Sequence, residues 1–99
     1  MKVILSADAD SDLERLGDHI AADNPARAVT FIRELRSRCA ALATMPERFP
    51  LVPRYQDRGV RRAVHGDYLI FYTVTAEAIV ILHVLHGHMD YSTLLFPEG

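Results

Sequence analysis

The sequence predicts an α+β fold: an N-terminal strand, a two-helix antiparallel hairpin, then a three-stranded antiparallel meander whose one face the helices cover. Two apolar runs rich in Val, Ile, Tyr and Phe, Tyr68–Val74 and 78–85, predict adjacent strands. Apolar residues recur every three or four positions over 7–22 and 25–44, which predicts two helices. We expect the whole chain, 1–99, to form one domain of this class.

The elements before the meander carry clear boundary signals. The short apolar run 3–5 predicts a strand at a sheet edge. Ser6 suits a helix N-cap, because its hydroxyl can accept a backbone N–H of the first turn. The first helix then begins with acidic residues, which the helix dipole favours: Asp8, Asp10 and Asp12. Asn24 and Pro25 are typical of a cap and a first helical position, so the second helix follows after a short link as a hairpin.

The segment after the second helix contains Pro46, Pro50 and Pro53, which exclude a regular element there. Its apolar residues predict that it wraps over the core. Gly66 and Asp67 then predict a tight turn into the strand Tyr68–Val74. Both faces of the last two predicted strands are apolar, and two helices can cover one face. The other face must therefore be buried by this segment, by the C-terminal tail or by a second chain.

Charge is distributed unevenly along the chain. The net charge is −2, yet nine of the eleven basic residues lie between 25 and 62, among three acidic residues. Such an arginine-rich stretch suits either a solvated surface or the binding of nucleic acid or carboxylates. No apolar run is long enough for a membrane span or a signal peptide. We expect a cytoplasmic protein in which the single cysteine, Cys39, packs as a small buried hydrophobe.

Particular residues recur in a fixed order through the predicted elements: Ala9, Asp12, Leu13, Asn24, Pro25, Ala28, Leu42, Pro46, Arg61, Gly66, Tyr68, Phe71, Tyr72, Val84, Leu85, His86, Gly87 and Asp90. This ordered set resembles the RelE/ParE toxins of type II toxin–antitoxin systems, and the closing Val84-Leu85-His86-Gly87 is nearer the ParE branch. The resemblance implies a toxin without a cofactor that poisons DNA gyrase and forms a hetero-oligomer with a ParD-like antitoxin encoded beside it. It leaves two alternatives: a RelE-like, ribosome-dependent mRNA endonuclease, and an attenuated member that still binds antitoxin.

Candidate residues follow from these alternatives. Metal-independent RNA cleavage needs a base, an acid and cations around the phosphate. The catalytic candidates are Arg58, Arg61, Arg62, His83, His86 and Tyr91. Two positions that the family usually keeps basic are His83 and Met89 here. The expected partner-binding residues, on the sheet face left open and on the tail, are Tyr68, Ile70, Tyr72, Arg61, Leu94 and Phe96.

The histidines near the end of the meander invite a metal interpretation, because zinc binds imidazole readily. On a strand, however, His86 and His88 point to one side and His83 is out of phase with them. Packing or hydrogen bonding to a partner explains these residues better, so we expect no metal site.

Overall fold

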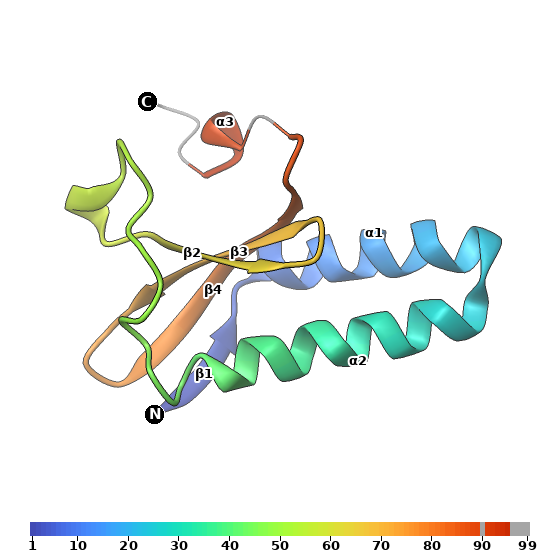
Figure 1. The fold of residues 1–99 in the computed structure, drawn as a ribbon, viewed down its shortest axis with the longest axis horizontal. Helices are drawn as coiled ribbons and strands as arrows, with labels where there is room; N and C mark the ends of the chain where they lie inside the picture. Colours follow the sequence, from blue (N-terminus) through green and yellow to red (C-terminus); the bar gives the residue numbers. More distant parts are fainter. Residues whose placement is uncertain (90, 96–99) are drawn as a thin grey trace.

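The computed structural model describes residues 1–89 and 91–95. The predicted order of elements is confirmed. The chain forms the elements β1 (Lys2–Leu5), α1 (Ala7–Asp23), α2 (Pro25–Ala41), a 3-10 turn (Gln56–Arg58), β2 (Arg61–His65), β3 (Tyr68–Val74), β4 (Ala78–His86) and α3 (Ser92–Leu95). Figure 1 shows α1 and α2 side by side along one side of the sheet, with α3 beyond the other side.

The two long helices begin where the caps predict. The Ser6 hydroxyl accepts the Ala9 N–H at 3.0 Å, and the Asn24 side chain accepts the Arg27 N–H at 3.0 Å. Pro25 occupies the start of α2. The end of α2 comes at Ala41, three residues earlier than predicted, because residues 42–44 tighten into turns with i→i−3 hydrogen bonds.

The four strands form one sheet in the order β1-β4-β3-β2. β2, β3 and β4 are the predicted antiparallel meander, and β1 joins β4 in parallel, with Lys2 opposite Ala78 and Leu5 opposite Ile81. The β2–β3 turn needs a left-handed residue, and Gly66 supplies it with φ 60°. The β3–β4 pairing is interrupted by a bulge, since Phe71 pairs with His83 while Tyr72 pairs with Ile81.

Each face of the sheet has its own apolar core. On the helix side, residues of α1 and α2 pack against β3 and β4, with Leu35, Ile70, Tyr72, Ile79 and Ile81 fully buried. On the opposite face, which we call the loop side, Val52, Tyr55 and Val60 pack on Phe71 and Leu85, and Tyr91 and Leu95 extend that contact. The proline-rich segment and the tail thus bury the second face within the chain itself.

This arrangement corrects one expectation. Ile70 and Tyr72 were predicted on the open face, but both are 0% exposed beneath the helices, so neither can present its side chain to a partner in this structure. The alternation within β3 was predicted correctly; the error lay in choosing the covered face. The tail was one of the three expected means of burying the second face, and it does pack on the loop side, where it forms the short helix α3.

Cys39 lies in the helix-side core, as predicted, with 2% of its surface exposed. Burial raises the pKa of its thiol to about 11, so it remains protonated and apolar at neutral pH. None of the helices described is both long enough and apolar enough to cross a membrane.

Candidate functional site

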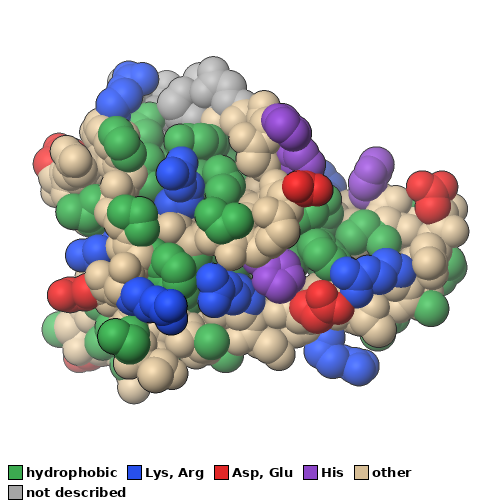
Figure 2. All heavy atoms as spheres, in the orientation of Figure 1, with side chains coloured by type: hydrophobic (Ala, Val, Ile, Leu, Met, Phe, Trp, Pro, Cys, Tyr) green, Lys and Arg blue, Asp and Glu red, His purple; other side chains and the backbone are tan. Residues whose placement is uncertain are grey.

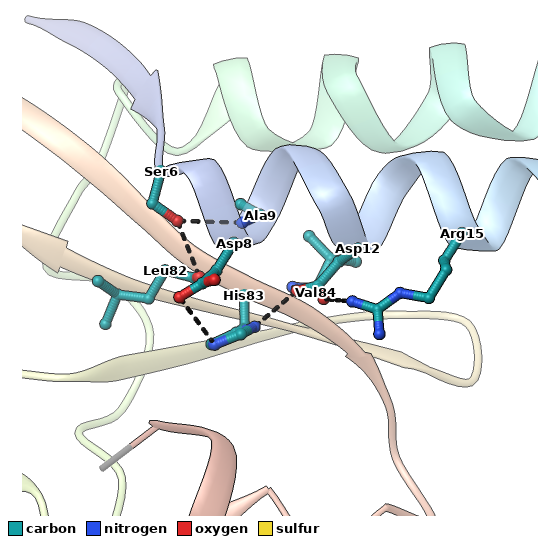
Figure 3. A network of polar contacts seen from close by, with 8 residues as sticks. All are labelled: Ser6, Asp8, Ala9, Asp12, Arg15, Leu82, His83 and Val84. Atoms are coloured by element: carbon teal, nitrogen blue, oxygen red, sulfur yellow. Dashed lines mark hydrogen bonds and ion pairs between the residues drawn. The ribbon is translucent and has the colours of Figure 1, made fainter. Parts of the chain in front are cut away.

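A polar network joins the start of α1 to β4 where β1 ends (Figure 3). The Ser6 N–H donates to the Ile81 carbonyl at 2.9 Å, and the Ser6 hydroxyl donates to the Leu82 carbonyl at 3.0 Å. One turn later, the Asp12 carboxylate accepts the Val84 N–H at 3.0 Å. These contacts continue the pairing of β4 after β1 has left the sheet, past the bulge, so its backbone groups remain satisfied.

His83 belongs to the same network. Its Nδ1 lies 2.7 Å from the Asp12 carboxylate, and because a carboxylate can only accept, Nδ1 carries the proton. Its Nε2 lies 3.8 Å from Asp8, while Arg15 pairs with the other oxygen of Asp12 at 3.0 Å. With 8% of its surface exposed, His83 lies between the buried carboxylate of Asp12 and the exposed carboxylate of Asp8. Its geometry is that of a structural residue that fixes the bulge.

Arg61 is tied to the proline-rich segment. One nitrogen of its guanidinium donates to the carbonyls of Glu47 and Phe49, at 3.1 and 2.6 Å. The guanidinium carbons of Arg38 and Arg48 lie 5.1 and 5.5 Å from the centre of the Phe49 ring, within cation–π range. Three arginines from α2, the segment and β2 therefore converge on Phe49.

No carboxylate among the described residues lies within ion-pair distance of Arg38, Arg48 or Arg61. Figure 2 shows Lys and Arg side chains gathered on this face, near the C-terminal end of α2. Beneath them, the Tyr72 hydroxyl donates to the Pro46 carbonyl at 2.9 Å. The cluster is therefore a concentration of positive charge held in place by contacts to carbonyls and to an aromatic ring.

Arg62 and Tyr91 meet on the loop side, 3.5 Å between guanidinium nitrogen and hydroxyl, and the Tyr91 ring packs 4.7 Å from that of Phe71. Arg58 lies exposed in the nearby 3-10 turn. Leu94, in α3, is 41% exposed, as a partner-binding residue requires. Phe96, the remaining tail candidate, lies outside the described residues.

His86 and Tyr68 lie at the other end of the strands. Their ring centres are 5.2 Å apart, Phe31 lies 5.4 Å beyond Tyr68, and His88 stacks on His86 at 4.9 Å. In register, His86 and Tyr68 share the end of the sheet that holds His65, whereas Arg61 begins β2. Arg61 and His65 are four residues apart along β2, so the two ends of the strand are separated by about 13 Å. The six catalytic candidates therefore do not converge on one point.

One further surface feature is a groove. A shallow groove between α2 and the end of β2 is lined by Thr30, Arg33, Glu34, Ser37, Arg38 and His65. Within residues 1–89 and 91–95, no three His, Cys, Asp or Glu side chains are grouped as metal ligands.

The sequence did not identify Arg38 or Phe49 as candidate site residues. The available signal was the excess of arginine in residues 25–62, which does not indicate which arginines lie close together.

Comparison with known proteins decides the family. Residues 3–91 match the family described as the ParE toxin of the type II toxin–antitoxin system parDE. The chain belongs to the ParE toxin family. A comparison with curated protein sequences found no match. The resemblance to RelE/ParE toxins drawn from the sequence is therefore confirmed.

Solved structures agree with the ParE assignment of the fold. A chain of the chromosomal ParDE toxin–antitoxin system from P. aeruginosa is 19% identical, with a TM-score of 0.74, over 87% of this chain and 95% of that one. A chain of the RelBE2 toxin–antitoxin complex from Mycobacterium tuberculosis is 27% identical, with a TM-score of 0.56, over 86% of this chain and 95% of that one. Both neighbours come from toxin–antitoxin systems.

Proposed function

We propose that this ParE-type toxin acts by binding a protein target, DNA gyrase, and that a ParD-like antitoxin encoded beside it neutralises it. The family match supports the class of protein. The observation that carries the mode of action is the dispersal of the catalytic candidates: Arg61 and His83 are engaged within the chain, and His86 lies at the far end of the sheet.

The separation of the catalytic candidates matters because metal-independent RNA cleavage needs its acid, base and cations within hydrogen-bond reach of one phosphate. His83 is bound to Asp12 and lies opposite Phe71 in register, on the loop side, whereas Phe49 packs against the helix-side core. A protein-binding toxin has no such requirement, since an interface uses side chains spread over a broad surface. The partly exposed Tyr68 and the exposed Leu94 suit contacts of that kind.

A supercoiling assay with purified gyrase tests the proposal. The chain should inhibit supercoiling and trap cleaved DNA in complex with the enzyme, and equimolar antitoxin should abolish both effects. A heat-denatured sample controls for non-specific binding to DNA. Normal supercoiling with no cleaved DNA, at toxin concentrations that stop growth in cells, would contradict the proposed target.

The second candidate is a RelE-like, ribosome-dependent mRNA endonuclease. The contact between Arg62 and Tyr91 favours it, because it places a cation and a phenol 3.5 Å apart on one surface. The neighbour from the RelBE2 complex is consistent with it.

Primer extension on translated mRNA tests this candidate. New 5′ ends should appear within codons on induction, and Arg62→Ala or Tyr91→Phe should remove them while Arg36→Ala leaves them. Intact mRNA together with inhibited gyrase would exclude the endonuclease.

A further inference from the structure

The outer face of the helical hairpin, which is turned away from the sheet, carries two rows of charge. Asp10, Glu14 and Asp18 are exposed on α1 at intervals of four residues, so they lie in one row along that helix. Arg33 and Arg36 are exposed on α2, three residues apart, and form a second row. Because the two helices lie side by side (Figure 1), the acidic row of α1 runs beside the basic row of α2.

A groove separates the two rows. It is lined by Asp10, Leu13, Glu14, Gly17, Asp18, Ile32 and Arg36. A Cβ atom added at Gly17 would lie 3.5 Å from Cγ1 of Ile32, so these two residues face one another across the hairpin. Since the helices are antiparallel, a step of three residues back along α1 matches a step of three residues forward along α2, and Glu14 lies level with Leu35. The acidic row and the two arginines therefore occupy the same stretch of the hairpin.

Neither row is neutralised within the part of the chain that the structure describes. The ion pairs of that part involve none of Asp10, Glu14, Asp18, Arg33 and Arg36. Exposed charges of both signs on one face thus remain available for contacts with another molecule.

We propose that two copies of this chain form a homodimer through the outer face of the hairpin. Its two-fold axis runs parallel to the helices, between the two hairpins, so that α1 of each copy lies on α2 of the other. Arg36 of one copy then lies near Asp10 and Glu14 of the other copy. Arg33 lies near Glu14 and Asp18 of that copy. Each contact occurs twice, as two-fold symmetry requires. The dimer goes beyond the proposed function, because it depends on neither the target nor the antitoxin.

The signs of the charges select this axis. A two-fold axis parallel to the helices places α1 of one copy antiparallel to α2 of the other, in the register that the two helices already have within one hairpin. An axis across the helices would instead place α1 on α1 and bring the carboxylates of Glu14 and Asp18 against those of the other copy. Like charges in contact weaken an interface, whereas complementary rows stabilise it.

An exposed apolar side chain supports the same arrangement. Val29 is 59% exposed and lies one turn before Arg33, in the same row of α2. In the register set by Gly17 and Ile32, Val29 is close to the level of Ala21. In the dimer, Val29 therefore packs near Ala21 of the other copy and adds an apolar contact to the charged ones.

A second copy matches this face better than other partners do. Nucleic acid would meet the acidic row as well as the arginines, and a helix of uniform charge would match one row and be repelled by the other. Each helix has 17 residues and is about 25 Å long, so the paired hairpins bury roughly 1,000 Å² in total, at the low end of specific interfaces. The expected dissociation constant is therefore in the micromolar range.

Sedimentation equilibrium of the full chain tests the dimer without any substitution. The parent chain should be dimeric at high micromolar concentration in low salt, and about 1 M NaCl should weaken the dimer roughly tenfold, because salt screens exposed charges. A chain that stays monomeric up to about 1 mM overturns the proposal. A dimer whose affinity does not change with salt overturns the pairing of charged rows.

Charge reversal tests which rows meet. Arg33→Glu/Arg36→Glu places carboxylates against the acidic row, and Glu14→Arg/Asp18→Arg places arginines against the basic row. Each variant alone should therefore dimerise roughly tenfold more weakly than the parent chain. An equimolar mixture of the two should form a heterodimer within about threefold of the parent affinity, because both of its contacts are complementary. All four positions are exposed, so both variants should fold, which circular dichroism checks.

The control is Lys2→Glu/Arg54→Glu, which makes the same change in net charge as the arginine reversal but on β1 and in the segment after α2. It should dimerise within about threefold of the parent chain. Equal weakening in this control would overturn the proposal, since net charge alone would then explain the loss. Reversal variants that dimerise as well as the parent chain, or a mixture of the two that stays monomeric, would also overturn it.

Discussion

The carboxylate of Asp12 lies 2.7 Å from Nδ1 of His83, and the same oxygen accepts the Val84 N–H at 3.0 Å. One side chain of α1 thus holds both a side chain and a backbone group of β4 at the point where the strand bulges. The side chain of Asp12 is 4% exposed, so water cannot readily replace these bonds. The contact fixes the position of α1 over the sheet.

Asp12→Ala should therefore lower the free energy of unfolding by roughly 2–4 kcal/mol, because it leaves two buried donors without an acceptor. Urea denaturation followed by circular dichroism measures the change. Asp18→Ala, at an exposed position of the same helix, is the control and should change stability by less than about 1 kcal/mol. Similar stabilities for the two variants would show that the Asp12 network contributes little.

Arg61→Ala should lose roughly 1–2 kcal/mol of stability, since the guanidinium no longer holds the carbonyls of Glu47 and Phe49. Arg48→Ala, which removes a guanidinium stacked on the same Phe49 ring, should cost less. Growth arrest by Arg61→Ala should persist at temperatures where the variant is folded. A variant of full stability that has lost toxicity would instead identify Arg61 as a functional arginine.

Arg54 occupies the left-handed region with φ 78°, in a turn closed by the Tyr55 N–H and the Val52 carbonyl at 3.1 Å. A side chain is unfavourable in that conformation, so Arg54→Gly should stabilise the protein by about 0.5–1 kcal/mol. Thermal unfolding measures the gain. Gly59→Ala provides the opposite test, because Gly59 has φ 68°, and it should lower the melting temperature. A loss of stability in Arg54→Gly would contradict the strain.

Tyr72 gives a pH dependence. Burial raises the pKa of its hydroxyl above the ordinary value of 10.0, so the folded state holds the proton more tightly than the unfolded state. This contribution to stability is complete below pH 10.0 and is lost as the pH rises through the raised value. Above pH 10.0, the free energy of unfolding of the parent chain should therefore fall more steeply than that of Tyr72→Phe. Parallel curves from denaturant titrations of the two proteins would contradict the raised pKa of Tyr72.

The sequence predicted those features of the fold that depend on local signals. Asn24 and Pro25 place the hairpin, and Gly66 with Asp67 places the turn, because capping and turn geometry depend on a few neighbouring residues. The side of the sheet that the helices cover was not predictable in this way. Tyr72 and Phe71 lie on opposite faces with similar side chains, and both are fully buried.

The candidate site was less accessible to prediction for two reasons. Strict alternation over β4 fails at the bulge, so Val84 joins the helix side with Ile81. In a strand that is apolar on both faces, a one-residue slip leaves no trace in the sequence. Asp12 was interpreted as a response to the helix dipole, and its buried role depends on a residue 71 positions away. Long-range contacts of this kind do not appear in local patterns.

The parallel pairing of β1 with β4 has a consequence for synthesis of the chain. Residues Lys2 to Leu5 leave the ribosome more than 70 residues before their partners, Ala78 to Ile81. The helical hairpin can form early, but β1 has no neighbouring strand until β4 has emerged. Contacts between such distant parts slow folding. A ribosome that stops before β4 is complete therefore releases a chain that lacks the central pairing of its sheet, whatever the target of the finished protein.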